Sequence, residues 1–165
     1  MTQNTRNHPV EFARRTLKNL RAIEAMKSQN RDVHVVTQLG LSLLGLIVFP
    51  EAKQVLPEAE TKTWAVMKGE GWPLWVIEED NPRASDKYGK TQTLADIIRH
   101  VRNAIAHGQV TFTSDSPDEN DVAIIVEDRY LSKPPAAPYW RARMEVRDLR
   151  VFCERLLPLI EESTR

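Results

Sequence analysis

The stretch that decides the fold is Thr93–Gly108, with the sequence TLADIIRHVRNAIAHG. Apolar residues recur in it at the three- and four-residue spacing of a helix; they are Leu94, Ile97, Ile98, Val101 and Ile105. This spacing predicts an amphipathic helix with one face in the protein core. Thr93 followed by Asp96 predicts a capping box at its start, although Glu is the usual acid there. Gly108 predicts a left-handed backbone conformation at its end.

Two helices are predicted before this stretch. The first runs from about Pro9 to Ser28 and has its own apolar stripe, made by Phe12, Thr16, Leu17, Leu20 and Ile23. The second, DVHVVTQLGLSLLGLIVF, is capped by Asp32 and stops before Pro50. It is apolar around much of its circumference, which predicts the central helix of the core. Gly40 and Gly45 should allow a neighbouring helix to approach closely.

Residues 51–92 are the least regular part of the chain. Pro57 can open a short helix to about Lys68, and an apolar knot follows at residues 72–77. The tryptophans of this segment, Trp64, Trp72 and Trp75, could stack on nucleic-acid bases. We favour the alternative, in which they cap one end of a helical bundle.

A β-hairpin is predicted at about residues 109–127, because Val110–Thr113 alternates and Val122–Val126 is apolar and largely β-branched. A last helix is expected from about Met144 to Glu162, with a kink at Pro158. The fold predicted from these patterns is all-α: an antiparallel bundle of four main helices, with a short helical insertion and a hairpin between the last two helices. Its length suits a single domain over residues 1–165.

Composition limits the possible functions. The formal net charge is zero, so binding to nucleic acid would need a local basic patch. Cys153 is the only cysteine, and the N-terminus lacks a signal-peptide pattern, so we expect a cytoplasmic protein. The longest apolar run, residues 39–49, is shorter than the roughly 20 residues that span a bilayer, so no membrane partner is expected.

No cofactor or metal is expected. A Gly-rich phosphate loop in its strand–helix context is missing from the sequence. His100 and His107 lie two helical turns apart, roughly 10.5 Å along the axis, which is too far for one metal ion.

The polar end of the central helix carries the residues with catalytic potential, Arg102, Asn103 and His107. Histidine can move protons near neutral pH, and arginine can stabilise charge on a phosphate. Asparagine can orient the phosphate or the imidazole. Together they suit metal-independent cleavage of RNA. Asn103 and His107 are one turn apart, but Arg102 and His107 diverge by about 140° around the axis. A second copy of the helix across a symmetry axis would bring the two side chains into one cleft.

The spacing of Arg102 and His107 is not selective by itself, because chance alone gives roughly 0.4 such pairs in a chain of this composition. On spacing alone we favour a capping His107, a surface Asn103 and an Arg102 paired with an acid. Further RNA contacts could come from Arg99 and His100. The first helix adds a basic ridge, Arg14, Lys18 and Arg21, for which a solvated face is the favoured interpretation.

A resemblance changes this weighting. The string Val101–Gly108, VRNAIAHG, near the end of a bundle helix resembles the signature of the HEPN superfamily. The strings RTLKNL from Arg15 and VTQL from Val36 resemble a plasmid- and prophage-associated branch, in which a hairpin follows the motif helix. The resemblance implies an all-α domain that dimerises through the motif helix. It also implies a metal-independent endoribonuclease site, built across the homodimer from Arg102, Asn103 and His107.

The resemblance also implies a setting in toxin–antitoxin or phage-defence systems, with RNA as substrate and an antitoxin or regulatory protein as a possible partner. Two alternatives stay open. The chain could be a non-catalytic dimeric RNA-binding, regulatory or scaffold protein, or a structural bundle whose motif helix is buried in an interface. Two copies of His107 opening onto one shared, solvent-accessible, positively lined groove would favour the nuclease, and sealed or widely separated copies would count against it.

Overall fold

The computed structural model describes residues 8–29, 32–43, 46–47, 57–82, 89–129 and 138–162. In chain order the elements are α1 (His8–Ser28), α2 (Val35–Leu43), the 3-10 helix η3 (Pro57–Glu60), α4 (Trp64–Gly69), β1 (Val76–Asp80), α5 (Leu94–Ala106), β2 (Val110–Phe112), β3 (Ala123–Asp128), β4 (Trp140–Glu145) and α6 (Val146–Glu162).

A four-stranded antiparallel sheet, in the order β1-β4-β3-β2, is a main part of the fold. The prediction of an all-α bundle is therefore wrong, and the fold combines helices with a sheet. The predicted hairpin is confirmed, because β2 pairs with β3 from Val110↔Val126 to Phe112↔Ile124. It is the outer part of a larger sheet, in which β3 also pairs with β4 along its whole length.

The two strands that the prediction missed have different origins. β4 has the sequence WRARME, and its buried and half-buried residues alternate with the period of two that a strand requires. The predicted start of the last helix at Met144 is wrong, because Met144 lies in β4 and the helix begins at Val146. β1 lies within the segment predicted to be irregular and pairs with β4 across an irregularity between Ile77 and Glu79. Its short, acidic sequence resembles a loop.

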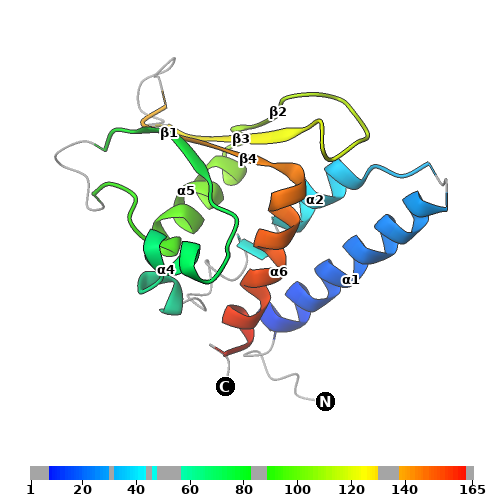
Figure 1. The fold of residues 1–165 in the computed structure, drawn as a ribbon, viewed down its shortest axis with the longest axis horizontal. Coiled ribbons are helices and arrows are strands. Elements are labelled where there is room, and N and C mark those ends of the chain that lie inside the picture. The colour runs from blue at the N-terminus through cyan, green and yellow to red at the C-terminus, as the bar shows by residue number, and fades with distance from the viewer. Residues whose placement is uncertain are drawn as a thin grey trace.

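The sheet has one buried face and one polar face. Ile124 and Val126 of β3 are buried, as are Trp140, Ala142 and Met144 of β4. The other face carries ion pairs such as Arg141 with Glu127 and with Glu78. Figure 1 shows the helices gathered on one side of the sheet. An antiparallel sheet with this division of residues packs one face on the core and leaves the other to solvent.

Helix α5 forms as predicted and packs on β3. Thr93 and Asp96 make the capping box: the Thr93 side chain accepts the backbone N–H of Asp96, and the Asp96 side chain accepts the backbone N–H of Thr93. At the C-terminal end, the N–H of Gly108 donates to the carbonyl of Ile105 and the N–H of Gln109 to that of Ala104. These two bonds are those of a Schellman motif, and Gly108 has the positive φ, 66°, that the motif needs.

The other helices partly follow the predictions. α1 is confirmed and packs against α2 and α6. α2 begins at Val35 rather than directly after Asp32. A Cβ built on Gly40 would lie 3.1 Å from Cζ of Phe112, so its close neighbour is a side chain of β2 rather than a helix. Gly45 lies outside the described residues.

The apolar stripe predicted for the last helix is confirmed. Its residues, Val146, Leu149, Phe152, Cys153, Leu156 and Ile160, are all buried. Burial raises the pKa of the Cys153 thiol to about 12, so this side chain behaves as a small apolar group of the core.

The tryptophan-rich segment closes one end of the core, as we favoured over base stacking. Trp72 and Trp75 are buried and each makes an edge-on contact with Phe152 of α6, at ring centroid distances of 5.7 and 5.9 Å. Trp64 is half-buried and packs against the same core.

Candidate active site at the C-terminal end of α5

His107 is the residue that most directly suggests chemistry. It follows the last helical residue of α5 as its C-cap, and its side chain is exposed. The imidazole makes no hydrogen bond to any other residue in the described parts of the chain. Arg102 and Asn103, within the last two turns of the helix, are half-buried. The structure thus keeps the histidine accessible while the two residues before it are partly enclosed.

Asn103 is held by a buried carboxylate that the sequence analysis did not single out. Asp128, the last residue of β3, is 4% exposed. Its Oδ2 accepts hydrogen bonds from Nδ2 of Asn103 at 2.8 Å, Nδ1 of His100 at 2.9 Å and the hydroxyl of Tyr139 at 2.6 Å. Three donors, two from α5 and one from the residue before β4, converge on one oxygen, which ties the motif helix to the sheet.

This convergence keeps Asp128 ionised. Burial by itself would raise the pKa of Asp128, because it penalises the charged form. The hydrogen bonds from His100, Tyr139 and Asn103 act in the opposite direction, and together they leave the pKa below its ordinary value. The carboxylate is therefore a permanent acceptor near neutral pH.

His100 is an internal part of this arrangement rather than a surface group. It is 5% exposed, and its ring stacks on that of Trp140 at 4.6 Å between centroids. With Nδ1 donating to Asp128, Nε2 is left as an acceptor 3.4 Å from the guanidinium of Arg99. Arg99 also donates to Asp96 at 3.0 Å. Both residues are predicted RNA contacts. The structure places His100 beneath the surface, and the guanidinium of Arg99 between His100 and Asp96.

The predicted basic ridge on α1 is already engaged with acids. Arg14 pairs with Glu161 of α6 at 2.7 Å, and Arg21 approaches Glu154 of the same helix at 3.7 Å. Lys18, between them on the ridge, is exposed. The two arginines of the ridge thus form ion pairs with α6 at the protein surface. A phosphate would have to compete with these carboxylates.

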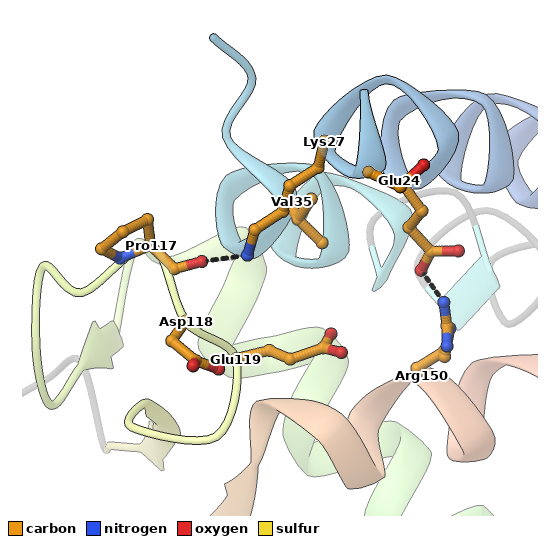
Figure 2. A pocket seen from close by; sticks show the side chains of 8 residues that line it. Glu24, Lys27, Val35, Pro117, Asp118, Glu119 and Arg150 are labelled. Atoms are coloured by element: carbon orange, nitrogen blue, oxygen red, sulfur yellow. Dashed lines mark hydrogen bonds and ion pairs between the residues drawn. The ribbon is translucent and has the colours of Figure 1, made fainter. Parts of the chain in front are cut away.

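A separate pocket of about 560 Å³ lies away from α5, between the end of α1, the start of α2, the β2–β3 connection and α6. Figure 2 shows that the two cationic side chains of its lining, Lys27 and Arg150, each contact a partner within the pocket. Lys27 donates to the carbonyl of Pro117, and Arg150 pairs with Glu24. Both cations are already paired, and the lining residues of the pocket lie on elements other than α5. The pocket is therefore separate from the residues gathered at the end of α5.

Two features bear on other kinds of site. In the described parts of the chain, no group of three or more His, Cys, Asp or Glu side chains is placed to hold a metal ion. No helix in those parts is both long and apolar enough to cross a membrane.

Asp128 and Tyr139 are the residues that sequence reasoning missed. One signal pointed to Asp128: Ile124, Val126 and Asp128 share the phase of the buried face, so a charged residue stands where the strand pattern asks for an apolar one. Tyr139 gave no comparable signal, since its position depends on β4 pairing with β3.

The whole chain, residues 1–165, matches the family described as HEPN pEK499 p136. The chain belongs to this HEPN family. The resemblance drawn from the motif string and the first two helices is thereby confirmed. Searches of the curated proteins and of the solved structures found no match to this HEPN domain.

Proposed function

We propose that this HEPN domain is a metal-independent endoribonuclease whose active site combines Arg102, Asn103 and His107. The observation that carries the proposal is the accessible imidazole of His107, at the end of the helix that also carries Arg102 and Asn103. The imidazole of His107 is exposed and makes no hydrogen bond within the described residues, so its ring is available for proton transfer to a ligand.

The reaction follows from these groups. The imidazole takes the proton of a ribose 2′-hydroxyl, and the 2′-oxygen attacks the adjacent phosphorus. The new bond joins phosphorus to the 2′-oxygen, the bond to the 5′-oxygen breaks, and a second imidazole, in its protonated form, gives its proton to the leaving oxygen. The products are a 2′,3′-cyclic phosphate and a free 5′-hydroxyl. The guanidinium of Arg102 stabilises the negative charge that builds on the phosphate.

A homodimer supplies the second imidazole. Arg102 and His107 diverge by about 140° on one ideal helix, so a single copy presents them in different directions. Two copies of α5 related by a twofold axis place the arginine of one beside the histidine of the other. The exposed end of α5 leaves His107 accessible for such pairing. The family resemblance adds a toxin–antitoxin or phage-defence setting, with an antitoxin as the candidate partner.

The test is cleavage of a mixed RNA pool by the purified protein in the presence of EDTA. We expect wild type to cleave and His107→Ala and Arg102→Ala to lose at least about a hundredfold in rate, the usual scale for a general acid–base group. His34→Ala and Arg147→Ala are matched controls, because both residues are exposed and lie on other helices or their flanks. They should cleave like wild type.

Product ends and assembly complete the test. Labelled fragments should carry 2′,3′-cyclic phosphates, and adding an excess of His107→Ala chains to wild type should lower the activity if the site spans two copies, because a mixed dimer holds only one of the two imidazoles. Cleavage by purified His107→Ala, or no cleavage of any RNA by wild type, would refute the nuclease. Binding without turnover would favour the non-catalytic RNA-binding alternative.

A further inference from the structure

The hydrogen bond between Asn103 and Asp128 determines which way the Asn103 amide faces. A side-chain amide has a donating nitrogen and an accepting oxygen, and only the nitrogen can bond to an ionised carboxylate. Nδ2 of Asn103 is 2.8 Å from Oδ2 of Asp128, and the pKa of that carboxyl is lowered. The amide is therefore locked with its nitrogen toward the sheet.

The locked amide leaves its oxygen as the polar atom available to a ligand. Oδ1 of Asn103 makes no hydrogen bond to any residue in the described parts of the chain. One turn further along the same face of α5 stands the exposed His107. An acceptor and a proton-transferring imidazole thus follow each other at the end of the helix.

We propose that Asp128 is a positioning residue of the ribonuclease site: it fixes Asn103 so that Oδ1 accepts the hydrogen bond of the ribose 2′-hydroxyl in the bound substrate and holds the 2′-oxygen in place until that proton passes to the imidazole of His107. The inference rests on the proposed function and deepens it. A 2′-hydroxyl is a donor and is the group that distinguishes RNA from DNA. With the amide reversed, a nitrogen would face the hydroxyl and leave its proton without this acceptor.

Asp128 is built for this role by its surroundings. His100 and Tyr139 donate to the same oxygen as Asn103, and the stacking of His100 on Trp140 restrains the ring. The carboxylate thus keeps two donors when Asn103 is removed. In a double-mutant cycle, Asn103→Ala therefore removes only this link, whereas Asp128→Asn also changes the acceptor of His100 and Tyr139.

The experiment measures kcat and KM for one RNA substrate in wild type, Asp128→Asn, Asn103→Ala and the double variant. We expect either single change to lower kcat on the order of tenfold to a hundredfold, as displacement of an orienting group does, with KM changed less than threefold. The double variant should be no slower than Asn103→Ala within about twofold, because Asp128 acts through Asn103. Circular dichroism and the melting temperature establish that each variant is folded.

Two further variants keep the test decisive. Tyr139→Phe removes one donor and retains the carboxylate, so it should fold even if Asp128→Asn does not, and it should lower kcat by a smaller factor than Asn103→Ala. Asp80→Asn is the matched control: Asp80 ends β1 and accepts the backbone N–H of Thr91 at 2.9 Å, near the other end of α5. It should leave kcat unchanged.

The outcomes separate the two proposals. A wild type that cleaves no RNA refutes the nuclease and, with it, the role of Asp128. A cleaving wild type whose Asp128→Asn variant is folded and equally active refutes the role of Asp128 alone. Effects that multiply in the double variant would also refute it, because they would mean that Asp128 supports the fold independently of Asn103. If Asp128→Asn does not fold, an unchanged kcat in the folded Tyr139→Phe variant would refute the role of Asp128.

Discussion

Replacing Tyr139 by Phe should measure the strength of the buried network beside α5. The change removes one hydroxyl and leaves the ring, so the edge-on contact with His100, at 5.7 Å between centroids, can persist. The bond lost is the one from the Tyr139 hydroxyl to Oδ2 of Asp128, at 2.6 Å. This length is typical of a hydroxyl that donates to an ionised oxygen.

The size of the loss follows from the geometry. A hydrogen bond to a charged group contributes about 1.5–3 kcal/mol to stability, and Asp128 retains two donors after the change. We therefore expect the lower part of this range, about 1.5–2 kcal/mol at pH 7. For a protein of this size, each kcal/mol lowers the melting temperature by about 2–4 °C, so the variant should melt about 3–8 °C below wild type.

The loss should depend on pH in one direction. Because the folded-state pKa of Asp128 is lowered, its contribution is fully present above the unfolded value of about 3.9 and is lost as pH falls through the folded value. Tyr139→Phe weakens one cause of that lowering. The stability difference between the two proteins should stay constant from pH 7 to about 5 and become smaller below about 4.

Urea unfolding followed by circular dichroism across this pH range is the assay, with Asp128→Asn as the reference background. In the Asp128→Asn background, Tyr139→Phe should lower the free energy of unfolding by less than half as much as in wild type, because the charged acceptor is gone. A difference below about 0.5 kcal/mol at pH 7, or one of equal size with and without the Asp128 carboxylate, would refute the reasoning about this network.

Substitutions at two other positions test the packing of the core. Gly40→Ala should alter the free energy of unfolding by less than about 1 kcal/mol, because the gain in helix propensity offsets a small shift of the Phe112 ring. Gly40→Leu should lower the free energy of unfolding by about 1–3 kcal/mol, because the larger side chain overpacks this contact. Equal stability of the two variants in urea would contradict the contact between Gly40 and Phe112. Phe152→Ala should cost about 3–5 kcal/mol and shift tryptophan fluorescence to the red, because the buried ring contacts Trp72 and Trp75; a loss under 1 kcal/mol would contradict the assignment of these rings to one core.

The sequence was most informative where a structure depends on neighbouring residues. The limits of α5, its capping box and the Gly108 turn could all be predicted, because each depends on residues within four or five positions of one another. The hairpin from Val110 to Val126 was predictable for the same reason. The choice of Arg102, Asn103 and His107 came from the motif, and their roles stay predictions until cleavage is measured.

What only the tertiary structure decided are the contacts between distant segments. β1 and β4 belong to one sheet because they pair although residues 81–139 lie between them in the chain, and a short acidic strand carries little local signal. Asp128 and Asn103 are 25 positions apart and meet because α5 packs on β3. The sequence by itself determined the helix and the motif at its end; the packing of that helix on the sheet decided which way Asn103 faces and left His107 open to solvent.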